Sequence, residues 1–174
     1  NYFRINGEPV FSIFNFHKFV EDCGGLDGAK EALDYFREET IKAGFPGLHL
    51  QVIAFGGNEK NPGILRYDLS EGKSNGELVS SLGINSVTKY NWGQGEGLED
   101  YIVWGEEAMK RRENWDEALD IPYFPNVSIG WDDTPRFPDK GEANVIHFNN
   151  SPESFAAYLQ KARDYVNEHP EQPR

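Results

Sequence analysis

The chain has 174 residues, of which 38% are hydrophobic and 14% aromatic, and this length and composition suit one domain with one hydrophobic core. Its 17 basic and 29 acidic residues give a net charge of −12, which argues against a nucleic-acid or anionic-membrane partner because such partners require clustered Lys and Arg. The single cysteine, Cys23, excludes an intrachain disulfide and a cysteine-based metal site, and no apolar run approaches the roughly 20 residues of a membrane span.

The hydrophobic pattern alternates between strand-like and helix-like periods along the chain. Asn6-Gly7 predicts a tight turn between two strand-like runs. The main strands are expected at 9–14, 48–55, 84–90, 123–130 and 143–148. The helices are expected from 26 until Gly44, at 75–82, at 98–119 after the Gly-rich segment 92–97, and from Ser151-Pro152-Glu153 onward.

Each of the three longer helices has an apolar face at helical spacing. The residues expected to be buried are Leu26, Ala29, Leu33, Phe36 and Thr40 in the first; Leu98, Tyr101, Ala108, Trp115 and Leu119 in the second; and Phe155, Tyr158, Leu159, Ala162, Tyr165 and Val166 in the last.

This order of elements predicts an α/β fold in which a parallel sheet of about five strands is covered by helices. An open doubly wound sheet and a part of a (β/α)8 TIM-type barrel both fit the pattern, since a complete barrel needs about 250 residues. No linker or repeat divides the chain, so residues 1–174 are predicted to form a single domain.

Polar and aromatic side chains gather where the predicted strands end, which is the ligand-binding edge of parallel α/β folds. The residues at these ends are Asn15, Phe16 and His17; Gly56, Gly57 and Asn58; Lys89, Tyr90, Asn91 and Trp92; Trp131, Asp132, Asp133 and Arg136; and His147, Asn149 and Asn150. A mixture of rings, amides and carboxylates is typical of a sugar site, because sugar C–H faces stack on aromatic rings while the hydroxyls need donors and acceptors in fixed positions.

Nine of these residues are predicted to bind the substrate. They are His17; Tyr90, Trp92 and Trp131, which would stack on sugar rings; Asn91, Asp132, Asp133 and His147, which would hydrogen-bond hydroxyls; and Arg136, which would orient an aspartate.

The acidic pair and the arginine after it also have structural alternatives. Asp132 and Asp133 precede Thr-Pro and could cap a turn, and two adjacent acids are not by themselves the opposed pair that cleaves a glycosidic bond. Arg136 could hold one of the aspartates as a structural ion pair.

The rings have structural alternatives as well. Trp92 and Trp131 could be core residues at the base of a loop, and His17 and His147 could be hydrogen-bonded structural histidines. The glycines of 93–97 match no phosphate-binding motif, so a hinged loop at the mouth of the site is their predicted use.

Residues 129–136 carry the string Ile-Gly-Trp-Asp-Asp-Thr-Pro-Arg. There the chain resembles the WbsX-type family, whose members carry Pro-Gly-Trp-Asp-Asn-Thr-Pro-Arg; Asp133 stands in the Asn place. The family is described as glycosyltransferase-like and is related to glycoside hydrolase family 99 and its endo-mannosidases. Supporting similarity lies in RINGEPVFSIF, GLHLQVIAF, GINSVTKYNW and VIHFNNSPESFAAYL, where Asn149 replaces the usual Gly.

The resemblance implies a (β/α)8 barrel of which this chain covers the middle-to-late part. It also implies that the paired glutamates for glycoside cleavage belong to a Trp-Asn-Glu-Trp-x-Glu-Gly motif, which this sequence does not contain. No catalytic residue is therefore assigned, and the chain alone is predicted to be inactive.

The expected function is that of a carbohydrate-active, glycoside hydrolase-like protein that acts on a glycan. The alternatives are a glycosyltransferase of polysaccharide synthesis and a non-catalytic carbohydrate-binding module. No cofactor and no metal are expected. The rest of a parent chain or a second copy would complete the barrel. The compartment stays open, with an extracytoplasmic location slightly favoured.

Overall fold

The computed structural model describes residues 2–54, 56–57, 62–93, 95, 97–119 and 121–173. Its contacts divide the chain into two compact units, which are described separately below. Unit 1 comprises Asn1–Tyr90, Asn114–Phe124 and Glu171–Arg174, and unit 2 comprises Asn91–Glu113 and Pro125–Pro170.

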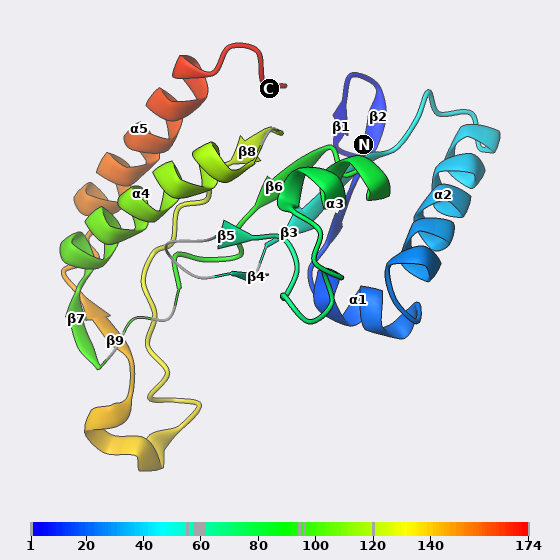
Figure 1. Ribbon diagram of the computed structural model, residues 1–174. Coiled ribbons are helices and arrows are strands. Elements are labelled where there is room, and N and C mark those ends of the chain that lie inside the picture. The colour runs from blue at the N-terminus through cyan, green and yellow to red at the C-terminus, as the bar shows by residue number, and fades with distance from the viewer. Residues whose placement is uncertain are drawn as a thin grey trace. The chain divides into compact units, whose positions relative to one another are not determined.

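The main sheet of unit 1 is parallel-rich, as the sequence predicts (Figure 1). Its strands are β1 (Arg4–Ile5), β2 (Glu8–Ile13), β3 (His49–Ile53), β6 (Ser86–Thr88) and β8 (Tyr123–Phe124). They are hydrogen-bonded in that order; β1 runs antiparallel to β2, and the other pairs are parallel. The order follows the chain, as in successive strands of a barrel, and does not reverse as in a doubly wound sheet. A mixed α/β fold with a parallel-rich sheet of five strands is thus confirmed, while its identity as part of a (β/α)8 barrel stays a prediction.

The β1–β2 hairpin has the turn that the sequence predicts. Asn6 and Gly7 adopt φ angles of 52° and 86°, as a two-residue turn with positive φ at both positions requires. A second, two-stranded antiparallel sheet in unit 1 pairs β4 (Gly56–Gly57) with β5 (Pro62–Gly63). Asn58, expected at the end of the second main strand, lies outside the described residues.

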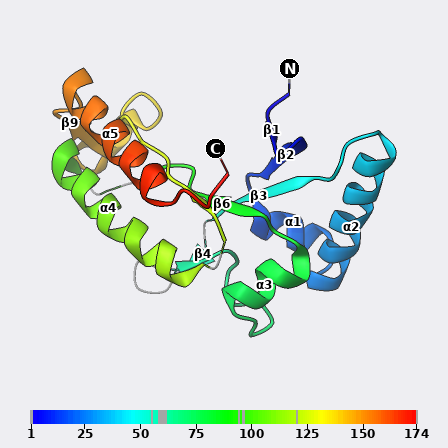
Figure 2. The same ribbon diagram turned by 90° about the horizontal axis from the view of Figure 1, so that it is seen from above.

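The helices of unit 1 are α1 (Phe16–Asp22), α2 (Leu26–Lys42) and α3 (Asn75–Leu82). The last two match the prediction; α3 begins with a Ser74/Glu77 capping box and ends at left-handed Gly83. The Arg37 side chain donates to the Leu82 and Gly83 carbonyls, which joins α2 to α3. Figure 2 shows the ribbons of α1, α2 and α3 in unit 1. On the predicted apolar face of α2, Phe36 differs from its neighbours because it is 36% exposed.

The short helix α1 was not predicted. Asn15 caps it by accepting a hydrogen bond from Lys18 N at 3.0 Å, and Phe16 and Val20 are its buried residues. Asn15, Phe16 and His17 follow the end of β2, as the sequence predicts, and Phe16 and His17 are the first residues of this helix.

Unit 2 is built around two parallel strands, β7 (Leu98–Asp100) and β9 (Ile146–Phe148). Each strand leads toward a long helix, α4 (Tyr101–Ala118) or α5 (Pro152–Glu168), and the 3-10 helix η1 (Pro138–Ala143) precedes β9 (Figure 1). Because 146–148 pairs with β7, the prediction that 143–148 adds a fifth strand to the main sheet is wrong. The helix expected at 98–119 begins at Tyr101, and Leu98 is a strand residue that is 71% exposed.

The predicted strand 123–130 is present only at Tyr123–Phe124. The Asn126 carbonyl accepts from Trp92 Nε1 at 3.0 Å, and the Ser128 carbonyl accepts from the Tyr101 hydroxyl at 2.7 Å. The Ile129 carbonyl accepts from Asn150 Nδ2. Side chains therefore satisfy backbone groups that a strand would pair with a neighbouring strand.

The core of unit 2 is a cluster of rings with Ala108. Its members are Trp92, Tyr101, Trp104, Ala108 and Tyr158. The Trp92 ring lies 4.9 to 5.6 Å, centroid to centroid, from its three ring neighbours, within the range of favourable ring pairs. Burial raises the pKa of Tyr101 and of Tyr158 to about 12. Both hydroxyls donate to backbone carbonyls, those of Ser128 and Ile102.

Helix α5 begins where the sequence predicts. Ser151 caps it by accepting from Ser154 N, and Pro152 is its first residue. Of its predicted apolar face, Tyr158 and Tyr165 are buried, whereas Leu159 is 48% exposed. Among the helices in the described ranges, none combines the length and the hydropathy that crossing a membrane requires.

Candidate functional site

Two of the predicted site residues belong to unit 1. His17 lies in α1, where its Nδ1 accepts a hydrogen bond from Arg66 N at 3.3 Å. Tyr90 is 56% exposed and meets the Phe14 ring edge to face at 5.0 Å. The other seven residues belong to unit 2, and the site is therefore built from unit 2 alone.

Asn91 and Trp92 are the first residues of unit 2 and lie in a turn. The Asn91 side chain accepts from Gly93 N at 3.0 Å, which is a local turn bond. Trp92 is only 6% exposed, and its Nε1 is engaged by the Asn126 carbonyl. The Trp92 ring is packed in the core of unit 2, as its structural alternative describes, and its role as a stacking surface stays a prediction.

Trp131 and His147 hold each other through two hydrogen bonds. Trp131 N donates to His147 Nδ1 at 2.9 Å, and His147 N donates to the Trp131 carbonyl at 2.9 Å. The His147 side chain is 0% exposed and stacks on Trp104 with centroids 3.9 Å apart. Trp131 is 38% exposed. The backbone of Trp131 is therefore fixed while part of its ring stays accessible, and His147 fits its structural alternative.

The two adjacent aspartates have different surroundings. Asp132 is exposed, and its Oδ1 accepts from Thr134 N at 2.9 Å. Hydrogen bonds from the Thr134 side chain and backbone hold the pKa of Asp132 below its usual value. Asp132 is accordingly an ionised acceptor on the surface next to Trp131.

Asp133 instead closes the loop that follows it. It is 6% exposed, and its Oδ1 accepts from Val145 N at 2.8 Å. Its Oδ2 pairs with Lys140 Nζ at 3.2 Å. Both carboxylate oxygens of Asp133 thus make structural contacts, and its predicted role as a sugar ligand stays a prediction. Among the described residues, Lys140 and not Arg136 is the cation that reaches it; Arg136 is exposed, with its guanidinium 5.6 Å from the Phe137 ring centroid.

We expect Asp133→Asn to lower the free energy of unfolding by about 1–3 kcal/mol, because it removes the charge that pairs with Lys140 and leaves a buried acceptor set incomplete. Asp132→Asn is the matched control: asparagine can still accept from Thr134 N, so stability should not change. Urea denaturation of both variants measures the difference. Equal losses would contradict this division between the two aspartates.

Glu99 is a candidate that the sequence interpretation missed. It lies directly opposite His147 in the β7–β9 register, with Glu99 Oε2 3.4 Å from His147 Nε2. Both atoms are buried, and neither has a hydrogen-bond partner among the residues that the structure describes. The signal was hidden because 98–100 was assigned to the start of a helix, where the alternation of a three-residue strand is not visible.

Gly95 lies directly against the Glu99–His147 pair. Its φ is +66°, and a Cβ there would lie 2.2 Å from Glu99 Oε2 and 2.9 Å from His147 Nε2. Only glycine fits such a close approach. The Gly-rich segment therefore contributes a close contact at this position.

The ends of β7 and β9 are joined by Asp100 and Asn149. Asp100 Oδ1 accepts from Ile102 N at 2.7 Å and so caps α4, while its Oδ2 accepts from Asn149 Nδ2 at 2.7 Å. These bonds, the one from Asn149 first, lower the pKa of Asp100. Asn149 has a φ of 61°, which explains how Asn can replace the Gly of the family pattern, since both residues tolerate this conformation.

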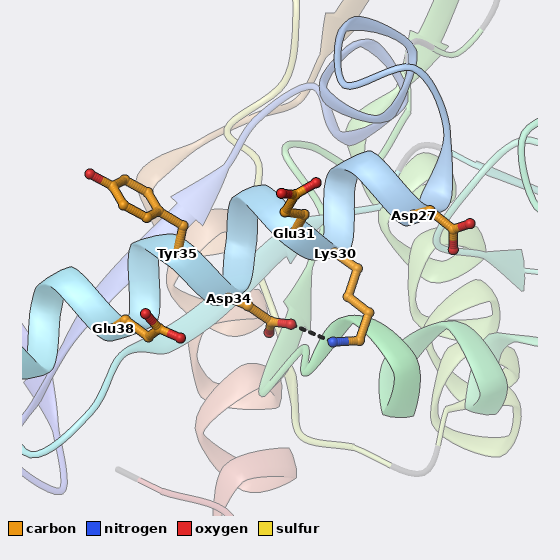
Figure 3. Close-up of a pocket in the computed structure, with 6 residues that line it drawn as sticks. All are labelled: Asp27, Lys30, Glu31, Asp34, Tyr35 and Glu38. Atoms are coloured by element: carbon orange, nitrogen blue, oxygen red, sulfur yellow. Dashed lines mark hydrogen bonds and ion pairs between the residues drawn. The ribbon is translucent and has the colours of Figure 1, made fainter.

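A separate depression of about 360 Å³ lies on the outer face of α2 (Figure 3). Its lining consists of Asp27, Lys30, Glu31, Asp34, Tyr35 and Glu38. Lys30 pairs with Asp34 within it. All six residues come from one helix, and none of them is a predicted site residue. This depression is an acidic helix surface and adds nothing to the site of unit 2.

A family model described as Glycosyltransferase WbsX matches residues 1–174. No curated protein and no solved structure matches the chain. The match covers both units and includes the Trp-Asp-Asp-Thr-Pro-Arg string. The chain therefore belongs to the Glycosyltransferase WbsX family, which makes it a carbohydrate-active protein.

Proposed function

We propose that this chain binds a glycan at a surface of unit 2 formed by Trp131 and Asp132, within a glycoside hydrolase-like protein. The observation that carries the proposal concerns Trp131. Its backbone N–H and carbonyl both hydrogen-bond to His147, while 38% of the residue is exposed. An aromatic ring fixed in this way can stack on a sugar face without a large loss of conformational entropy.

The neighbouring carboxylate supplies the polar half of such a surface. Asp132 is exposed and its pKa is lowered, so at neutral pH it accepts hydrogen bonds from sugar hydroxyls. Arg136 is exposed on the same loop and adds donors. A ring beside a charged acceptor is the combination that distinguishes a sugar site from a purely apolar patch.

The proposal assigns no catalytic carboxylate to this chain. Asp133 is engaged by Val145 and Lys140, and cleavage of a glycosidic bond needs two opposed carboxyl groups about 5–9 Å apart. As in the resemblance to family 99, we place the cleaving pair outside these residues. A sensitive assay for reducing ends should detect no turnover of any glycan by the 174-residue chain.

A glycosyltransferase is the second candidate, because the matching family model carries that description. Such an enzyme needs a site for a nucleotide sugar, and a net charge of −12 is unfavourable to that anionic ligand. Thermal-shift measurements separate the candidates. A nucleotide sugar that raises the melting temperature, with no effect from oligosaccharides, would favour the transferase; the reverse result would favour our proposal.

We expect Trp131→Ala to weaken glycan binding by about 10-fold or more, which corresponds to about 1.4 kcal/mol, because the stacking surface is lost. The probe is an array of defined oligosaccharides, followed by calorimetric titration with the strongest binder. Tyr67→Ala, which removes a ring that is 89% exposed in unit 1, is the control and should bind normally. Equal binding by wild type and Trp131→Ala would refute the proposed surface.

A further inference from the structure

The tautomer of His147 is fixed by the hydrogen bond that it accepts. Trp131 N–H donates to His147 Nδ1 at 2.9 Å, and a nitrogen that accepts cannot carry a proton. A neutral His147 therefore carries its proton on Nε2. An Nδ1–H tautomer or an imidazolium would place two N–H groups against each other and would break the bond to Trp131.

The Nε2 side of the ring faces Glu99. The two residues lie opposite each other on β7 and β9, and the buried Glu99 Oε2 lies 3.4 Å from Nε2. Gly95 covers both atoms without a side chain. Stacking on Trp104 fixes the plane of the imidazole ring. The ring is therefore held on its Nδ1 edge by Trp131 N and on its face by Trp104, while its Nε2 edge faces Glu99 Oε2 at 3.4 Å.

We propose that Glu99 is a positioning residue: it holds the Nε2 proton of His147, so that the bare Nδ1 fixes the backbone of Trp131, the glycan-stacking residue. This inference deepens the proposed function and rests on it for the role of Trp131. The positioning of His147 between Glu99 and the Trp131 amide does not depend on that function, because it involves only contacts within unit 2. A carboxylate that orients an imidazole in this way is a general device for selecting one tautomer.

The first test needs no ligand: it measures the tautomer of His147 and the hydrogen exchange of the Trp131 amide. Nitrogen-15 NMR of the whole chain at pH 7.5 should show His147 as the Nε2–H tautomer, and the Trp131 amide should exchange slowly with solvent. Glu99→Ala should speed exchange of the Trp131 amide by about 10-fold, equivalent to about 1.4 kcal/mol of local opening. Glu99→Gln should retain slow exchange, because its carbonyl still accepts from Nε2. Glu113→Ala, which removes an exposed carboxylate of unit 2, is the control and should behave as wild type.

A second measurement, the affinity for an oligosaccharide, tests whether Glu99 affects glycan binding. With the oligosaccharide selected on the array, Glu99→Ala should bind about 5- to 10-fold more weakly, and Glu99→Gln should bind like wild type. If Glu99→Ala does not fold, the tautomer in the wild type and the behaviour of Glu99→Gln still decide the question. An Nδ1–H or doubly protonated His147 in the wild type, or unchanged exchange in a folded Glu99→Ala, would overturn the inference. If the wild type shows the Nε2–H tautomer and slow exchange of the Trp131 amide but binds no glycan, the proposed function is overturned and the role of Glu99 in positioning His147 still holds.

Discussion

Replacing Trp92 by alanine is expected to lower the free energy of unfolding by about 3–5 kcal/mol, the range for truncating a large buried aromatic residue. Trp92 is 6% exposed and contacts Tyr101, Trp104 and Tyr158, so its removal leaves a cavity among rigid rings. It also removes the hydrogen bond from Nε1 to the Asn126 carbonyl. Urea denaturation followed by circular dichroism measures the loss.

Trp131→Ala is the matched control for this prediction, because it removes the same side chain from a partly exposed position of the same unit. Its cost should be roughly half that of Trp92→Ala or less, since less apolar surface leaves the interior. The two variants should therefore differ in what they lose: Trp92→Ala should lose mainly stability, and Trp131→Ala should lose mainly glycan binding. A Trp92→Ala variant within about 1 kcal/mol of wild type would contradict the assignment of Trp92 to the core.

Gly105→Ala is expected to destabilise the protein by about 1–3 kcal/mol, although alanine is the better helix former by about 1 kcal/mol. Gly105 lies inside α4, and a Cβ there would lie 2.2 Å from Cζ and 2.4 Å from the hydroxyl oxygen of Tyr158. Tyr158 is 2% exposed, and its hydroxyl donates to the Ile102 carbonyl at 2.8 Å. The ring cannot move aside without breaking that bond or disturbing the cluster, so α4 and α5 must separate.

Gly76→Ala gives the comparison without a clash. Gly76 lies inside α3, and a Cβ there would meet nothing within 4 Å. Removing the flexibility of glycine should leave stability unchanged or raise it by up to about 1 kcal/mol. Chemical denaturation of both variants decides the matter. If Gly105→Ala proves as stable as Gly76→Ala, the close packing of Tyr158 on α4 is not as the structure describes.

The site could be predicted as a region but not residue by residue. The string from Trp131 to Arg136 identified the family, and Trp131 and Asp132 lie beside β9, where they contact His147 and Ile146. That this loop binds a sugar stays a prediction. Asp132 and Asp133 are identical in type and adjacent in sequence, yet one is exposed and the other closes a loop. Only Val145 and Lys140, which come later in the chain, distinguish them.

Glu99 escaped prediction for a similar reason. Three residues of strand before an eighteen-residue helix carry too little alternation to be recognised, and the register that sets Glu99 opposite His147 joins segments 48 positions apart. No local feature of the sequence encodes that pairing.

The sequence by itself determined the features that depend on neighbouring residues. These are the Asn6-Gly7 turn, the capped starts of α3 and α5, the alternation of strands and helices, and the family. Backbone conformation and capping require only a few adjacent residues, so the sequence displays them directly.

The tertiary structure alone decided which carbonyls are taken by distant side chains, which strands pair, and which rings are buried. The 125–130 segment is not a strand because Trp92, Tyr101 and Asn150 bind its carbonyls. Such partners are chosen by long-range packing, in which burial and hydrogen bonding are satisfied together across the fold.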